Sequence, residues 1–106
     1  MKTKRVLVVD VGGSRVKALV TGEETPVRKE SGRLFTARQM VDAVKEITAH
    51  WEYDVITLGI PSAIRQGKIL REPVNLGGGW VNFDFESAFG KPVKLINDAA
   101  MQAIAV

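Results

Sequence analysis

The residues that most constrain this chain lie between positions 5 and 17, where the sequence reads RVLVVDVGGSRVK. Val6–Val9 is a continuous apolar, mostly β-branched run, which is typical of a strand buried on both faces. Gly12 and Gly13 allow the backbone to turn tightly and to approach a ligand closely. A second apolar run, Val16–Val20, follows at once. The stretch therefore predicts a β-hairpin.

The tip of this hairpin carries chemistry that suits a phosphate group. Asp10 places a carboxylate at the end of the first strand, where a charge is costly unless it has a partner or a task. The Ser14 hydroxyl, Arg15, Lys17 and bare backbone N–H groups could meet an anion, while Asp10 holds a metal ion or its water. A Gly-Gly hairpin alone is equally consistent with a simple turn. The sequence contains neither a P-loop nor a dinucleotide-binding fingerprint.

Composition narrows the possible functions further. The chain has 106 residues, of which 45% are hydrophobic and 25% charged, as in a single globular domain. Without cysteine there are no disulfides, thiolate metal sites or cysteine nucleophiles, and a single His makes a His-based triad or metal site unfavourable. The net charge of +3 comes from scattered basic residues with few aromatics nearby, so we expect no nucleic-acid partner. A solvated basic surface is the first interpretation, and binding of phosphate-bearing substrates is the second.

The ends and the hydropathy of the chain predict its location. Only Met-Lys-Thr-Lys-Arg precedes the first strand, so no apolar signal segment fits before the fold. No run approaches 18 consecutive apolar residues. We therefore expect a cytoplasmic protein that makes no contact with a membrane.

The remaining patterns predict an alternation of helices and strands. We expect an edge strand at 27–31, a helix at 36–48, a strand at 54–60, a turn-containing excursion at 64–71, a short helix at 84–89, a strand at 92–96 and a helix from 97 to the end. Thr36 and Gln39 form a capping box for the first helix. Three antiparallel strands followed by parallel strands with intervening helices define an α/β fold with a mixed sheet.

Three further segments, at predicted strand ends or in loops, could contribute residues to a ligand-binding site. The strand at 54–60 breaks at Pro61 and Ser62, where open α/β sheets place ligand loops. Asn75 and Trp80 bracket three glycines, which predicts either a flexible loop or a loop that covers a substrate. The pair at 97–98 follows a strand and opens a helix. It could be a simple N-cap, or Asp98 could accept a proton from a substrate hydroxyl.

In order and rough spacing, these motifs resemble the N-terminal lobe of ROK-family sugar kinases, within the sugar kinase, actin and Hsp70 superfamily. The matching segments are DVGGSRVK at 10–17, GIPS at 59–62, NLGGGW at 75–80 with NFD at 82–84, and LIND at 95–98. The NL…W…NFD run is most similar to the polyphosphate glucokinase branch. The resemblance spans essentially all 106 residues and implies a ribonuclease-H-like (actin-like ATPase) domain.

The resemblance also implies roles for individual residues. Asp98 would act as general base toward the attacking hydroxyl, and Asp10 would help to hold Mg²⁺. Gly12, Gly13, Ser14 and Lys17 would contact phosphoryl groups from ATP or polyphosphate, and Pro61, Ser62, Asn75, Asn97 and Asp98 would line the sugar pocket. The implied activity is phosphorylation of a hexose, glucose at its 6-hydroxyl in the branch named above.

The chain also departs from the family pattern. Ser62 stands where family members usually have Gly, and Ser14 replaces the commoner Thr. ROK kinases continue into a second lobe, so residues 1–106 are expected to form one lobe, inactive alone and self-associating through the apolar helix at 99–106. A non-catalytic sugar-sensing regulator of the same fold is the alternative function. Such regulators carry a DNA-binding helix-turn-helix before the first strand, where only a few residues stand here.

Overall fold

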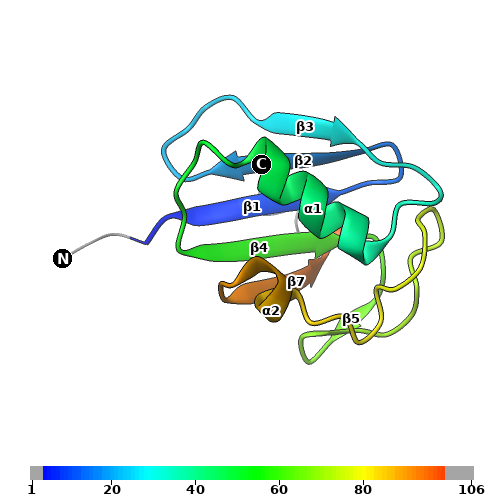
Figure 1. The fold of residues 1–106 in the computed structure, drawn as a ribbon. Helices are drawn as coiled ribbons and strands as arrows, with labels where there is room; N and C mark the ends of the chain where they lie inside the picture. Colours follow the sequence, from blue (N-terminus) through cyan, green and yellow to red (C-terminus); the bar gives the residue numbers. More distant parts are fainter. Residues whose placement is uncertain (1–3, 100–106) are drawn as a thin grey trace.

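A computed structural model describes residues 4–99 of the chain, which are built around a five-stranded sheet (Figure 1). The strand order across this sheet is β3-β2-β1-β4-β7. Its strands are β1 (Val6–Val11), β2 (Arg15–Val20), β3 (Val27–Glu30), β4 (Val55–Ile60) and β7 (Val93–Asn97). Two helices, α1 (Ala37–Ile47) and α2 (Phe85–Phe89), and a small hairpin of β5 (Ile64–Arg65) and β6 (Lys68–Ile69) complete the described elements.

The sheet is mixed, as the sequence predicts. Strand β2 runs antiparallel to both β1 and β3, whereas β4 is parallel to β1 and β7 is parallel to β4. The carboxyl ends of β1, β4 and β7 therefore meet at one edge of the sheet, and the β1–β2 turn lies at the same edge. The predicted α/β fold with an antiparallel start is confirmed.

Helix α1 covers one face of the sheet, across which it lies in Figure 1. Its predicted capping box is present: the Thr36 hydroxyl accepts from the Gln39 N–H at 3.1 Å, and the Gln39 side chain accepts from the Thr36 N–H at 3.0 Å. The apolar side of the helix packs on alternate residues of the central strands. The fully buried members of this core include Leu7, Val9, Val11, Val16, Met40, Val41, Val44, Leu58 and Ile60.

The prediction that β1 is buried on both faces is wrong for the described residues. Burial alternates along the strand, with Leu7, Val9 and Val11 buried but Val6, Val8 and Asp10 only half-buried. Within residues 4–99, both α1 and α2 contribute to the core on the face that carries Leu7, Val9 and Val11. Strand β1 also extends to Val11, so that Asp10 lies within the strand and not at its end.

The glycine-rich loop is anchored by a buried side chain and by hydrogen bonds at its base. Trp80 is completely buried in the core. The Gly77 N–H donates to the carbonyl of Phe35 at 2.8 Å, and the Glu72 carboxylate accepts from the backbone N–H groups of Trp80 and Val81 at 2.8 and 3.0 Å. The loop at 72–81 is thus closed at its base and held against the segment before α1.

The remaining elements follow the sequence closely. Asp84 caps α2 through a bond from the Ser87 N–H at 3.0 Å, and Gly90 ends that helix in the left-handed conformation. The excursion at 64–71 is a hairpin whose turn residues, Gln66 and Gly67, have φ of 52° and 74°. A helix begins at Asp98, and the predicted continuation over 100–106, with the self-association inferred from it, lies outside the described residues.

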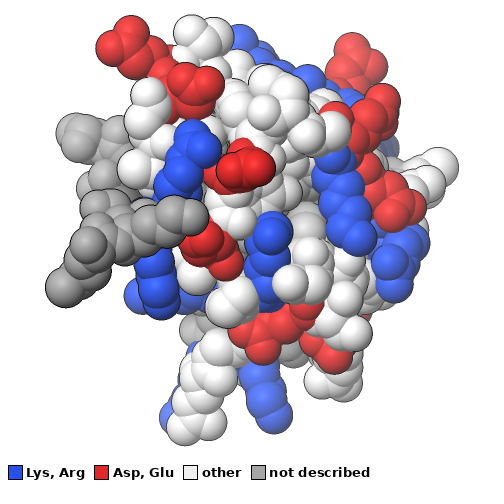
Figure 2. Space-filling view, turned by 60° about the vertical axis from the view of Figure 1, so that its left-hand side comes forward, with Lys and Arg blue, Asp and Glu red and all other residues white. Residues whose placement is uncertain are grey.

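The molecular surface mixes charges of both signs. Figure 2 shows Lys and Arg interspersed with Asp and Glu on the face it presents, without a large patch of one sign. Within residues 4–99, neither helix is long and apolar enough to cross a bilayer.

Candidate functional site

The tip of the β1–β2 hairpin is closed by backbone contacts and clamped from β3. The Gly12 N–H donates to the Arg15 carbonyl at 2.9 Å. Ser31, just beyond β3, donates its hydroxyl to the Gly12 carbonyl at 2.7 Å and its N–H to the Ser14 carbonyl at 3.1 Å. These bonds hold the tip in one shape without using its exposed face.

The two glycines of the tip are required for space and not for an unusual backbone angle. Neither Gly12 nor Gly13 has a positive φ. A Cβ placed on Gly13 would lie 3.2 Å from the Cβ of Asn75, and one on Gly12 would lie 3.2 Å from the Arg15 carbonyl oxygen. The structure thus brings the loop that carries Asn75 directly against the predicted phosphate-binding turn.

A hollow of about 460 Å³ opens beside this tip. It is lined by Asp10, Gly12, Gly13, Ser14, Arg15, Lys17 and Arg28. All five residues that the sequence assigns to phosphate or metal therefore border one space. Arg28, for which the sequence predicts only a place in an edge strand, borders it as well.

Asp10 supplies the negative charge of this hollow. Partial burial raises the pKa of its carboxyl, the Lys17 ammonium opposes that rise, and the charge of Asp98 adds to it. Lys17 lies directly across from Asp10 in the β1–β2 ladder, which accounts for the attraction. An ionised Asp10 is thus held in an environment that favours a further cation nearby.

The sequence offers two roles for the pair at 97–98, a helix cap and a proton acceptor, and the structure assigns the cap to Asn97. The Asn97 side chain accepts from the Ala99 N–H at 2.9 Å and donates to the Ser62 carbonyl at 2.8 Å. Asn97 is therefore the cap of the helix that begins at Asp98, and it ties this helix to the turn after β4. Within residues 4–99, the Asp98 carboxylate makes no such hydrogen bond, and Asp98 stands at the edge of the sheet where β1 ends.

The turn at Pro61 and Ser62 closes the carboxyl end of β4. The Ser62 N–H donates to the Ile60 carbonyl at 2.8 Å, which turns the chain sharply around Pro61. Ser62 is largely buried, and its hydroxyl donates to the Arg71 carbonyl at 2.7 Å. The structure thus uses this hydroxyl to hold the hairpin excursion, whereas Pro61 stays half-exposed at the strand end.

Two positioning residues escape sequence analysis. Ser31 and Glu72 fix the hairpin tip and the 72–81 loop through bonds to backbone groups that are distant in the sequence. No local pattern marks a side chain whose partner is the backbone of another element. Arg28 and Lys29 are successive residues of a strand, so their side chains point to opposite faces of the sheet. Only Arg28 shares a face with Lys17, which lies opposite it on the neighbouring strand.

The donor set at this edge fits a magnesium ion that is shared with a phosphate ligand. Mg²⁺ is usually held by one or two carboxylates, water and phosphate oxygens and not by a complete protein cage. Asp10 supplies one such carboxylate, in the hollow beside the 12–14 turn. Within residues 4–99, no group of three or more His, Asp or Glu side chains offers an all-protein metal site.

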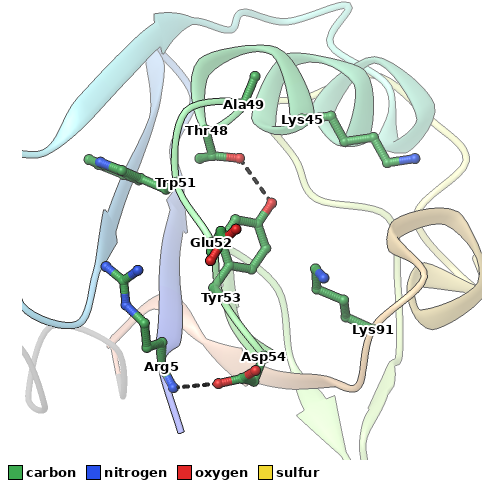
Figure 3. A pocket seen from close by; sticks show the side chains of 9 residues that line it. All are labelled: Arg5, Lys45, Thr48, Ala49, Trp51, Glu52, Tyr53, Asp54 and Lys91. Atoms are coloured by element: carbon green, nitrogen blue, oxygen red, sulfur yellow. Dashed lines mark hydrogen bonds between the residues drawn. The ribbon is translucent and has the colours of Figure 1, made fainter.

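A different hollow, of about 640 Å³, lies at the opposite edge of the sheet (Figure 3). Two pairs of groups in its lining bond to one another: Thr48 and Tyr53 share a hydroxyl contact of 2.9 Å, and the backbone N–H of Arg5 donates to the Asp54 carboxylate at 2.8 Å. The Lys91 ammonium lies 5.3 Å from the centre of the Tyr53 ring. These contacts join the start of β1 and β4 to the end of α1, and they give the hollow a structural role.

Comparison with solved structures identifies the fold of this chain. The Lmo2764 protein from Listeria monocytogenes, described provisionally as an N-acetylmannosamine kinase, matches with a TM-score of 0.72 and 25% identity over 95% of this chain. The ROK hexokinase from Thermus thermophilus matches with a TM-score of 0.71 and 25% identity, also over 95%. The chain has the fold of sugar kinases.

A glucokinase from an Antarctic psychrotroph shares this sugar-kinase fold at a TM-score of 0.70 and 18% identity, over 99% of the chain. In each of these comparisons the chain spans well under half of the matched protein, 38%, 37% and 35% respectively. No protein-family model matches the sequence. No curated protein matches it either.

Proposed function

We propose that this chain is the N-terminal lobe of a two-lobe ROK-type sugar kinase that phosphorylates a hexose. The observation that carries the proposal is the meeting of two motifs at one edge of the sheet. The phosphate-type turn at 12–14 and the acidic strand end at Asp98 are far apart in the sequence, yet the parallel pairing of β1 with β4 and of β4 with β7 brings them to the same edge of the sheet. This arrangement supports a donor site at the turn and an acceptor site beside Asp98.

In the proposed reaction, Asp98 accepts the proton of a sugar hydroxyl while that oxygen attacks the terminal phosphorus of the donor. The bond from phosphorus to the bridging oxygen of the donor breaks, and the shortened donor leaves with the electron pair. Such transfers depend mainly on positioning and on charge neutralisation. A general base contributes about 10²–10⁴-fold to such a step.

The other residues at this edge position the two substrates. Backbone N–H groups of Gly13 and Ser14, with Lys17, face the donor phosphates in this proposal. Asp10 holds Mg²⁺, which when bound neutralises charge on the donor. Asn75 and Pro61 border the acceptor, and Asn97 fixes the direction of Asp98 by capping its helix.

The proposal also names a sugar and a phosphoryl donor. The similar structures bear the names of kinases for N-acetylmannosamine, hexose and glucose. We propose glucose, at its 6-hydroxyl, as the first acceptor to test, with ATP or inorganic polyphosphate as donor. The NL…W…NFD run favours the polyphosphate glucokinase branch.

The test uses the protein encoded by the whole open reading frame. Purified protein is incubated with Mg²⁺, each donor and a panel of glucose, mannose and N-acetylmannosamine, and sugar phosphates are identified by mass spectrometry. We expect one sugar phosphate to accumulate with at least one donor. Saturable sugar binding without any phosphorylated product would contradict the proposal and favour a sugar-sensing regulator.

A further inference from the structure

The hollow beside the hairpin tip contains a pair of like charges that the fold itself does not explain. Lys17 of β2 and Arg28 of β3 are directly opposite one another in an antiparallel ladder, so their side chains leave the sheet on the same face. Like charges in this arrangement destabilise a sheet. Both side chains are exposed, and both line the hollow with Asp10.

The neighbours of Arg28 do not neutralise it. Asp10 lies across from Lys17 on the other side of β2, so Lys17 separates Arg28 from that carboxylate. Glu30, the next residue of β3 on this face, is opposite Arg15. Within residues 4–99, the ion pair recorded on β3 joins Lys29 to Glu46, on the face covered by α1. Arg28 is therefore a cation that faces the hollow with no recorded ionic partner in the described chain.

Arg28 lies on the side of Asp10 that is away from Asp98. Along the sheet order in Figure 1, Asp98 follows β7, Asp10 lies on β1, Lys17 on β2 and Arg28 on β3. Adjacent strands are separated by about 4.8 Å, so the backbone of Arg28 is roughly 10 Å from that of Asp10. In the proposed reaction the sugar lies beside Asp98, next to β7. Arg28, on β3, is at the other end of this series of four residues.

We infer that Arg28 binds the non-transferred phosphoryl groups of a linear phosphoanhydride donor whose terminal phosphate is held at the 12–14 turn. This inference rests on the proposed kinase function. A phosphoanhydride chain carries negative charge along its length, and a single hairpin tip neutralises only its end. The Lys17–Arg28 pair places two cations where the chain continues, and Arg can bind phosphate oxygens through two parallel N–H bonds.

The test measures binding of inorganic tripolyphosphate and of orthophosphate to the full-length protein by calorimetry, without sugar. We expect Arg28→Gln to weaken tripolyphosphate binding about three- to tenfold and to leave orthophosphate binding unchanged. Lys29→Gln is the matched control, because it removes the same charge from the neighbouring residue on the opposite face. It should leave both affinities unchanged.

A measurement of thermal stability separates binding from a structural role. Without anion, Arg28→Gln should not lower the melting temperature, because it relieves the repulsion from Lys17. A lower melting temperature with equal losses for both anions would overturn the inference. Equal tripolyphosphate affinity for Arg28→Gln and Lys29→Gln would overturn it as well.

Turnover assays distinguish this inference from the proposed function. With ATP and with long-chain polyphosphate as donors, Arg28→Gln should raise the donor KM for the natural donor and leave the sugar KM unchanged; the donor affected identifies the source of the phosphate chain. Arg28-dependent tripolyphosphate binding without any sugar phosphorylation would refute the proposed function alone. Normal sugar phosphorylation with a donor KM indifferent to Arg28 would refute the inference alone.

Discussion

Replacing Gly77 by Ala tests whether the 72–81 loop is held rigidly against the segment before α1. A Cβ on Gly77 would lie 2.5 Å from the carbonyl oxygen of Leu34, 2.6 Å from its carbonyl carbon and 3.0 Å from that of Phe35. All three atoms belong to the backbone, so no side chain can rotate away. The loop must shift and stretch the bond from the Gly77 N–H to the Phe35 carbonyl, which is 2.8 Å long.

The expected cost follows from these contacts. Forcing extra carbon into a packed site costs about 1–3 kcal/mol, and weakening the backbone bond adds about 1 kcal/mol. For a domain of this size, each kcal/mol lowers the melting temperature by about 4–8 °C. We therefore expect Gly77→Ala to lower it by roughly 10–30 °C. Because this loop carries Asn75, the sugar KM of the full-length protein should also rise.

Gly78→Ala is the matched control for this experiment. A Cβ on Gly78 meets no atom within 4 Å, and its φ is not in the left-handed region. Its melting temperature, followed by circular dichroism, should stay within a few degrees of the wild type or increase slightly. Equal melting temperatures for Gly77→Ala, Gly78→Ala and the wild type would refute the rigid-loop interpretation.

Three further substitutions test the site. Asp10→Asn should make the fold more stable at neutral pH. Burial raises the pKa of Asp10, so the folded chain holds the proton more tightly than the unfolded chain, and stability is lost as pH rises through that raised pKa. Asparagine carries no charge at any of these pH values and avoids this loss. Chemical unfolding at mildly acidic and neutral pH checks this, and an unchanged pH dependence would contradict it. Ser31→Ala removes the bond to the Gly12 carbonyl, so it should cost about 1 kcal/mol of stability and raise the donor KM. Ser14→Ala is its control: it keeps that bond and should cost less stability. Glu72→Ala leaves two backbone N–H groups at the loop base without their carboxylate, so hydrogen exchange of Trp80 and Val81 should accelerate; unaltered exchange would show that the carboxylate does not close the loop.

Local patterns in the sequence predict most of the fold. The capping box at Thr36 and Gln39, the Asp84 cap and the Gly90 stop all appear as expected, because each depends on a few adjacent residues. The hairpin at the start of the chain follows from its two apolar runs. The error at β1 has a different cause: an unbroken apolar run indicates burial but does not show how many faces are covered by helices.

The candidate site is predictable only in part, because it depends on contacts between distant segments. The motifs locate Asp10, the 12–14 turn and Asp98, and the sheet order brings them to one edge. The bond from the Ser62 hydroxyl to the Arg71 carbonyl, nine residues along the chain, has no signal in the local sequence. The clamp from Ser31 and the cation at Arg28 emerge only from the pairing of β2 with β3.

The most direct test of the proposed function is the rate of sugar phosphate formation by the full-length Asp98→Asn protein. Asparagine keeps the size of the side chain but cannot accept the proton, so kcat should fall by about 10²–10⁴-fold with little change in melting temperature. Asp84→Asn is the control, since Asp84 also stands at a helix start but caps α2. It should keep wild-type turnover. Near-normal turnover by Asp98→Asn would show that Asp98 is not the base and would contradict the proposed mechanism.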